Sequence, residues 1–334
     1  RFADQSAEES VSDLKPFQQK LGLLGSNNDG GLKGELSQLA TYFIDLLKAI
    51  FLIEAFTLFD LIERVEKQRE SLLILFIYLG EIDAALSVAS LRAGTLKTCR
   101  PEVIAAEKLF AAKNVYHPLI NNCVTNDIDI RSRSVLITGS NMSGKTTFLR
   151  TLIVNSILAQ TIYTCFADSF QTPIVKQFSS IRIDDSLLEG TSYYFEEVNT
   201  MGALINEAAS SNQNMFVLDE VFKGTNTVER IASAKAILSY LNRNNNLVIV
   251  STHDIELSRM LDTEYELFHF VETIQNNKFH FDHKIKPGPL RTRNAIRILE
   301  MSNYPEEIIR EAQQISKSLD GGPVDNTRND PHQP

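Results

Sequence analysis

The sequence predicts an α/β fold with a mostly parallel sheet, preceded by a helical segment. Two observations carry this prediction. Over residues 32–112, apolar residues recur at steps of three and four, which is typical of helices. From about Val115 onward, short β-branched runs alternate with helical stretches, the pattern of parallel strands covered by helices. The expected strands are residues 135–138, 180–183, 215–218 and 247–251.

The N-terminal part is expected to begin with a polar stretch and to continue as helices. Residues 1–30 are polar and end in GSNNDGG, a loop signature. Residues 42–62 form an apolar stretch long enough to cross a membrane. Charges at the centre of a bilayer are costly, so the charged residues in this stretch favour a buried helix of a soluble protein instead. These charged residues are Asp45, Lys48, Glu54 and Asp60.

The composition is that of a soluble globular protein and not of a dedicated nucleic-acid module. The 334 residues are 43% hydrophobic and 22% charged, and the net charge is -9. Nucleic-acid modules are usually basic, so a DNA contact would be a local patch or lie elsewhere. Cys99, Cys123 and Cys165 lack metal-type spacing and are expected to be reduced thiols in a cytoplasmic protein. The sequence shows no signal peptide.

A glycine-containing turn follows the first expected strand and precedes an amphipathic helix. Its spacing is G-x-x-x-x-G-K-[ST], in which glycines let successive backbone amides point at phosphate oxygens. Lys145 is expected to reach the β- and γ-phosphates, and the Thr146 hydroxyl to bind Mg²⁺. The turn therefore predicts a nucleotide site made of Gly139, Ser140, Asn141, Met142, Ser143, Gly144, Lys145, Thr146 and Thr147.

Two later strands end in polar residues that suit phosphate chemistry. The third expected strand runs into Asp219 and Glu220. Asp219 is expected in the Mg²⁺ shell with Thr146, and Glu220 is placed to orient or deprotonate the attacking water. The fourth strand runs into His253, which is expected to hydrogen-bond the γ-phosphate or the water. Glu220 and His253 are thus the candidate catalytic residues.

The segment DDSLLEGTSYYFEEV, residues 184–198, leaves two alternatives open. Gly190 and Ser192 precede an acidic, helix-like stretch. A helix that starts there offers an anion site at its N-terminus, or Ser192 is a simple N-cap. The residues alone do not choose between these alternatives.

These pieces, in this order, resemble the ATPase domain of the MutS family of DNA mismatch repair proteins, a branch of the ABC-type ATPases. The family patterns TGPNMGGKST, DDLxxGxSTFxxE, DEIGRGT and ATHYxEL are similar to TGSNMSGKTT, DDSLLEGTSYYFEE, DEVFKGT and STHDIEL here. GRHPxxE, GCFVPA and AGxPxEVIxRA are similar to VYHPLIN, TCFADS and SNYPEEIIREA. The resemblance covers residues 113–317. It implies an ABC-type P-loop ATPase domain over residues 113–318, after a lever-like helical segment (1–112) and before a disordered tail (319–334).

The resemblance also implies how the site works. Such ATPases form homodimers with two composite sites that use ATP and Mg²⁺. Gly190 and Ser192 of one subunit would then face, in trans, the nucleotide held by the partner's loop, and Asn141 would contact phosphate from its own loop. Nucleotide state would control the grip on DNA, and the process implied is DNA mismatch repair. No membrane contact is expected for this segment.

Several positions depart from the family pattern. Cys123 stands where the family often has an aromatic residue that stacks on adenine. Phe222 and Lys223 replace glycine and arginine after the acidic pair. The sequence has no G-x-F-x-E element, and about 110 upstream residues are too few for a mismatch-reading domain, a connector and a clamp. The alternative is therefore a MutS-like ATPase that serves as a nucleotide-gated clamp or scaffold without mismatch recognition. Its role would be recombination or another task on DNA structures. In either case DNA is an expected partner, bound by this chain or through domains absent from it.

Overall fold

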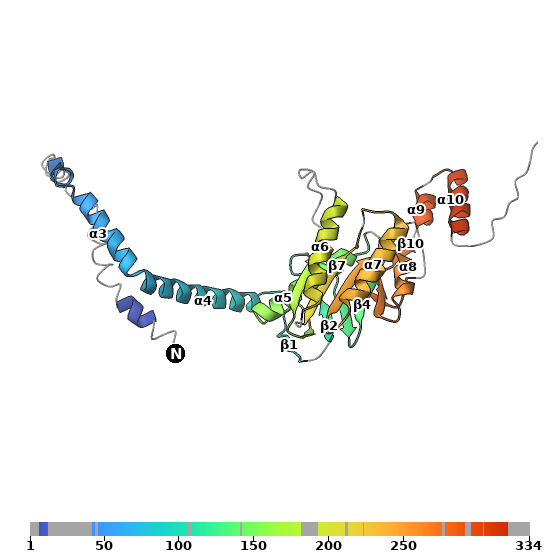
Figure 1. The fold of residues 1–334 in the computed structure, drawn as a ribbon, viewed down its shortest axis with the longest axis horizontal. Helices are drawn as coiled ribbons and strands as arrows, with labels where there is room; N and C mark the ends of the chain where they lie inside the picture. The colour runs from blue at the N-terminus through green and yellow to red at the C-terminus, as the bar shows by residue number, and fades with distance from the viewer. Residues whose placement is uncertain are drawn as a thin grey trace, which may run out of the picture. The chain divides into compact units, whose positions relative to one another are not determined.

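The computed structural model places the chain in two compact units, residues 1–94 and 95–334, and each is described by itself (Figure 1). The residues that the structure describes are 7–12, 42–43, 46–105, 108–140, 142–181, 193–210, 213–222, 224–275, 278–290, 295–302 and 304–319. The expected tail, residues 319–334, lies outside them except for Leu319, which ends a helix.

The first unit contains the helices α3 (Ile53–Lys67) and α4 (Arg69–Ala93). The expectation of one buried helix over residues 42–62 is wrong. The chain turns at Phe51 and Leu52, where Leu52 takes a φ of 48°, and α3 begins only after that turn. Apolar spacing predicts a helical face but not what covers it, and many of these side chains are exposed. They include Tyr42, Phe43, Leu46, Ile50, Phe56 and Phe59.

Among the described helices, α4 alone is long and apolar enough to cross a membrane by length and composition. It has 25 residues, its best window has a mean hydropathy of 2.0, and none of that window is buried. It lies downstream of the membrane-length stretch noted in the sequence. A single helix of this kind is a weak indication, because core helices of soluble proteins pass the same test.

The second unit begins earlier than the helical pattern predicts. The helical pattern extends to residue 112 in the sequence, but α4 ends at Ala93, and strands β1 (Glu102–Val103) and β2 (Phe110–Val115) follow. Both pair with β5 (Ser169–Thr172) in a four-stranded sheet of order β1-β5-β2-β3, which ends with β3 (Asn126–Ile130). Pairing with strands far along the chain overrides the local helical pattern here. The boundary between the two compact units lies at residue 94.

The central sheet of the second unit has six strands in the order β12-β9-β4-β8-β7-β6. The five from β9 to β6 are parallel, and β12 pairs antiparallel with β9. The α/β class predicted from the sequence is confirmed. The strand expected at 180–183 lies earlier, at Lys176–Ser180. The bounds are β4 (Ser134–Thr138), β6 (Lys176–Ser180), β7 (Asn214–Asp219), β8 (Leu247–Thr252), β9 (Tyr265–His269) and β12 (Lys286–Pro287).

Helices cover both faces of this sheet (Figure 1). Val135 and Ile137 of β4 pack in one apolar cluster with α5 (Lys145–Thr161). Leu136, between them, points to the other face and packs in a second cluster with the other helices, because side chains alternate along a strand. These helices are α6 (Tyr193–Ala208), α7 (Thr227–Leu241) and α8 (Ile255–Met260).

The remaining elements follow the sheet. A hairpin, β10 (Glu272–Gln275) and β11 (Lys278–Phe281), precedes β12. The chain then forms α9 (Ala295–Met301) and α10 (Glu306–Leu319). The EEIIREA part of the segment SNYPEEIIREA forms the first half of α10.

Candidate functional site

Three neighbouring parallel strands bring the predicted motifs together at one edge of the sheet. β8 lies between β4 and β7, with Thr252 opposite Thr138 and Ser251 opposite Asp219. The residues that follow these positions therefore converge at the carboxyl ends of the strands, where ligands bind in open α/β sheets.

The turn after β4 needs glycine at both of its glycine positions. Gly139 has a φ of 156° and Gly144 a φ of 108°, which side chains disfavour. A β-carbon on Gly139 would lie 2.9 Å from the carbonyl oxygen of Phe270, and one on Gly144 would lie 3.3 Å from Nδ1 of His283. The backbone of the turn thus lies close to Phe270 and His283. The turn forms a cradle, the concave backbone of residues 139–140 and 142–144 at the start of α5, where amide groups and the helix dipole favour an anion.

Lys145, the first residue of α5, is 4% exposed at the edge of this cradle. Its Nζ donates to the carbonyl oxygens of Gly139 at 2.8 Å and Ser140 at 2.9 Å. The same Nζ lies 3.4 Å from each ring nitrogen of His253. A buried ammonium is costly unless it is hydrogen-bonded, and these contacts supply that stabilisation beside the place where an anion fits.

Two oxygen-bearing side chains from separate motifs, Thr146 and Asp219, meet at the start of α5. The Thr146 hydroxyl donates to Oδ2 of Asp219 at 2.7 Å. The Ser251 hydroxyl donates to the other carboxylate oxygen, Oδ1. Hydroxyl and carboxylate oxygens are the donors that Mg²⁺ prefers, so this pair fits that ion.

Glu220 and His253 also come together. Nε2 of His253 lies against Oε1 of Glu220, whose side chain is 10% exposed. Glu220 has a φ of 55°, and its backbone N–H donates to the carbonyl oxygen of Ser251 at 3.0 Å. A left-handed conformation in a non-glycine residue costs about 1–3 kcal/mol and persists where the surrounding structure enforces it, often at functional sites.

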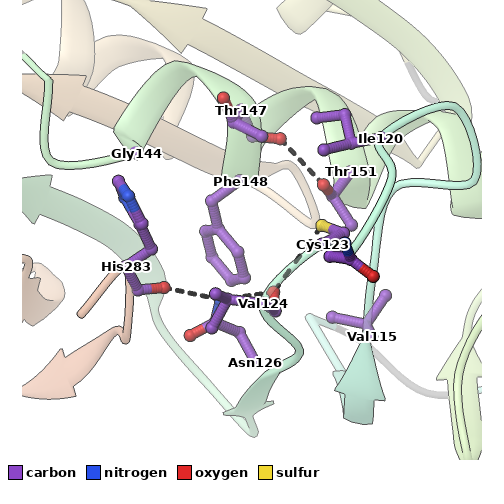
Figure 2. Close-up of a pocket in the computed structure, with 11 residues that line it drawn as sticks. Val115, Ile120, Cys123, Val124, Asn126, Gly144, Thr147, Phe148, Thr151 and His283 are labelled. Atoms are coloured by element: carbon purple, nitrogen blue, oxygen red, sulfur yellow. Dashed lines mark hydrogen bonds between the residues drawn. The ribbon is translucent and has the colours of Figure 1, made fainter. Parts of the chain in front are cut away.

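Two adjoining cavities lie over the turn. One, of about 370 Å³, is lined by the turn and both acidic residues: Ser140, Met142, Gly144, Lys145, Thr146, Thr147, Asp219, Glu220 and His283. The other, of about 310 Å³, shares Gly144, Thr147 and His283 with it and is otherwise mostly apolar. Figure 2 shows Cys123, Phe148 and His283 around this second cavity. The pair suits a ligand with an anionic end and a flat apolar end.

His283 is a residue that the sequence motifs did not single out. Its Nδ1 lies 3.1 Å from the carbonyl oxygen of Ser143, and its own carbonyl accepts from Nδ2 of Asn126 at 3.0 Å (Figure 2). It reaches the turn from the segment after β11, 140 residues beyond Ser143. No local spacing pattern marks such a residue, because only the tertiary fold brings it to the site.

Some predicted residues lie outside the described ones. Asn141, Gly190 and Ser192 are in this group, so their roles stay predictions. Met142 is described, with a φ of 68° and a side chain that is 81% exposed. The structure brings the other predicted site residues together at the sheet edge.

An ion pair beside His253 is a second feature that the motifs missed. Arg230 of α7 donates to Asp254 through Nε at 3.0 Å and Nη2 at 2.7 Å. These hydrogen bonds raise the pKa of Arg230, and both side chains are largely buried.

The thiols are free, as expected. Cys99 and Cys165 face each other in an antiparallel bridge. Burial, followed by the neighbouring Cys99, raises the pKa of Cys165 to about 12, so this thiol stays protonated and unreactive near neutral pH. Cys123 lines the second cavity, and its thiol accepts from the backbone N–H of His117 at 3.4 Å.

Comparison with known proteins decides the family. Residues 135–320, more than half of the chain, match the family model for MutS domain V. The chain belongs to the MutS family. Similar proteins include the DNA mismatch repair protein MutS of Lactobacillus delbrueckii subsp. bulgaricus, 32% identical over 234 residues. Those of Lactobacillus acidophilus and Thermus thermophilus are 30% identical over 270 residues and 27% over 263. The family resemblance found in the sequence is confirmed.

The chain spans less than a third of the length of these MutS relatives. The matched stretches cover 66%, 77% and 77% of this chain but 27%, 31% and 31% of the respective relatives. The MutS domain V match itself begins in β4, so the cavity wall formed by residues 115–126 lies upstream of it.

The structure accounts for one departure from the MutS pattern. Where the pattern DEIGRGT has its first glycine, this chain has Phe222, which takes a φ of 61°. Glycine adopts that conformation at no steric cost, which explains the pattern. Phe222 accepts the strain and is 4% exposed, with its ring centroid 5.9 Å from that of Tyr194 in α6. Burial of the ring offsets the cost of the left-handed backbone.

Proposed function

We propose that this chain binds ATP with Mg²⁺ and hydrolyses it, as the ATPase part of a MutS-type protein in DNA mismatch repair. The observation that carries the proposal is the hydrogen bond between Thr146 and Asp219. It joins the glycine-containing turn to the acidic strand end, two motifs that lie 73 residues apart in the sequence, at 2.7 Å. Membership of the MutS family supports the same assignment.

The two cavities divide the nucleotide between them in this proposal. The phosphates lie in the cavity with Lys145 and Asp219, and the base lies in the apolar cavity beyond Gly144. His283 borders both cavities and would face the base. Cys123 would offer the base a thiol instead of an aromatic face. The loss of a stacking partner weakens base binding by about 0.5–1.5 kcal/mol.

Each residue then has a defined part in hydrolysis. Lys145 redirects its hydrogen bonds from the turn's carbonyls to phosphate oxygens. Thr146 and Asp219 hold Mg²⁺, which supplies charge neutralisation on the phosphates when bound. Glu220 accepts the proton of the attacking water, and His253, in contact with Glu220, orients the carboxylate and the water.

Ser251→Ala should raise the Mg²⁺ concentration needed for half-maximal hydrolysis by about tenfold. The Ser251 hydroxyl orients Asp219, and its loss leaves that carboxylate free to rotate away from the ion. A Mg²⁺ titration of ATP hydrolysis measures the effect. Ser258→Ala is the matched control, because Ser258 is equally buried but bonds to the carbonyl of Ile255 in α8. A half-maximal concentration unchanged in Ser251→Ala contradicts this role.

The composite site belongs to the proposal as well. In a homodimer, Gly190 and Ser192 of one subunit would complete the site on the loop of the other. A twofold axis would build two such sites at once. Hydrolysis would release the subunits and so couple the nucleotide state to the grip on DNA.

Mixing Ser192→Ala with Lys145→Ala subunits tests the composite site. Each variant alone has two defective sites, whereas a mixed dimer keeps one intact site. We expect hydrolysis in the mixture to exceed that of either variant alone. Activity in the mixture no higher than in the separate variants means that Ser192 does not act in trans.

A second candidate is a nucleotide-gated clamp or scaffold without mismatch recognition. The net charge of -9 favours it, because DNA-binding surfaces are usually basic. Hydrolysis measured without DNA, with perfect duplex and with mismatched or branched duplex separates the two. A change specific to the mismatched or branched duplex supports the repair role. Equal rates in all three mean that this chain by itself does not sense the DNA structure, which favours the second candidate.

A further inference from the structure

Arg230 and Asp254 connect two helices beside the site, outside the motifs that define it. Arg230 lies in the first turn of α7, and Asp254 is the N-cap residue of α8. The two side chains meet through a pair of hydrogen bonds, of 3.0 Å and 2.7 Å. They are 23% and 15% exposed, so the pair is screened far less than a surface ion pair.

Arg230 does not stabilise its own helix, and Asp254 forms no capping hydrogen bond in its own. A cation in the first turn of a helix faces the positive end of the helix dipole, which is unfavourable for Arg230. An aspartate at an N-cap usually accepts from its own helix, yet the Asp254 side chain makes no such bond. The family pattern ATHYxEL has tyrosine at this position, so the pattern does not supply the ion pair. The ion pair therefore links the start of α7 to the start of α8.

His253 is the residue just before Asp254, so it lies at one end of this link. On its other side, Thr252 pairs with Thr138 in the sheet, and the Thr252 hydroxyl accepts from the backbone N–H of Asp254 at 3.0 Å. His253 therefore lies between one residue held by the sheet and one held by α7. From there its ring reaches Glu220.

We propose that Arg230 is a positioning residue, which acts through Asp254 to hold His253 against Glu220. Its kinetic consequence rests on the ATPase function proposed above. Neither Arg230 nor Asp254 lines the two cavities described above. Removal of the Arg230 side chain therefore slows the hydrolytic step and spares nucleotide binding, because a small misplacement of a catalytic group lowers the rate of the reaction.

The kinetic experiment compares variants of the full chain. Arg230→Ala should lower kcat by about tenfold to a hundredfold and leave the Kd for ATP within about threefold. Arg230→Lys, which keeps the charge but not the paired geometry, should fall between Arg230→Ala and the wild type. The double variant of Arg230→Ala with Asp254→Ala should fall no further than Arg230→Ala alone, because one interaction is lost in each case.

Lys235→Ala is the matched control. Lys235 also lies on α7 and pairs with a carboxylate, that of Glu264, at 3.0 Å, although this pair is more exposed, at 35% and 31%. Its removal should leave kcat unchanged. Thermal unfolding of every variant shows that the fold is intact at the assay temperature. An Arg230→Ala enzyme with the wild-type kcat, or one that loses ATP affinity as strongly as kcat, overturns the proposal.

Ring-¹⁵N histidine NMR provides a readout that needs no activity. The chain has six histidines, and His253→Gln assigns the signal of interest. The His253 signal should shift in Arg230→Ala, move back toward the wild type in Arg230→Lys, and stay in place in Lys235→Ala. An unshifted signal in Arg230→Ala overturns the positioning role. A wild-type chain that hydrolyses no ATP refutes the proposed function instead, and the NMR result then still decides the positioning role.

Discussion

Glu220→Gln is expected to lower the turnover of ATP by about 10²–10⁴-fold while ATP stays bound. Glutamine keeps the size and the hydrogen-bonding shape of the side chain but does not accept the proton of the attacking water. It also loses the charge that faces the ring of His253. Steady-state hydrolysis and equilibrium binding of ATP to the purified chain measure the two quantities separately.

The matched control for this substitution is Glu207→Gln. Glu207 lies in α6 and forms an exposed ion pair with Lys176 at 2.8 Å, away from the cavities. It should hydrolyse ATP at the wild-type rate. If Glu220→Gln also keeps the wild-type rate, Glu220 is not the general base and the assignment of the acidic strand end is wrong.

Lys145→Met is expected to weaken ATP binding by about a hundredfold. Charge-assisted hydrogen bonds contribute about 1.5–3 kcal/mol each, and about 1.4 kcal/mol corresponds to a factor of ten in affinity. Methionine fills the buried space of the lysine stem but offers no donor to phosphate. Calorimetric titration with ATP and Mg²⁺ gives the Kd directly.

Lys176→Ala is the control for loss of a positive charge, because Lys176 lies in an exposed ion pair on β6. Its ATP affinity should match the wild type. The carbonyl oxygens of Gly139 and Ser140 lose their donor in Lys145→Met, so thermal unfolding must be recorded alongside. A folded Lys145→Met variant that binds ATP with unchanged Kd contradicts the phosphate role of the lysine.

Local spacing predicted which residues lie together at the centre of the candidate site. The glycine positions, Lys145 and Thr146 follow a fixed pattern, and each has a reason visible in the backbone or in a contact. Asp219 and His253 follow apolar strands, and parallel strands place such residues at one edge of the sheet. The spacing of apolar residues and the residue types that a turn requires are local properties, so they can be read directly from the sequence.

What the sequence did not reveal depends on distant pairing. His283 contacts Ser143 from 140 residues further along the chain. Arg230 in α7 contacts Asp254 at the start of α8, 24 residues away. The short strand β1 was taken for helix because its pairing with β5 lies about seventy residues away along the chain. The sequence also predicted burial for residues 42–62 wrongly, because an apolar helix face does not show which other part of the protein packs against it.

The most direct test of the account is steady-state ATP hydrolysis by the purified chain with and without Mg²⁺, with Glu220→Gln purified identically to exclude a contaminating ATPase. The account predicts release of phosphate by the wild type that requires Mg²⁺ and is nearly abolished in Glu220→Gln. Absence of hydrolysis by the wild type, or the same rate in both proteins, contradicts the ATPase assignment itself.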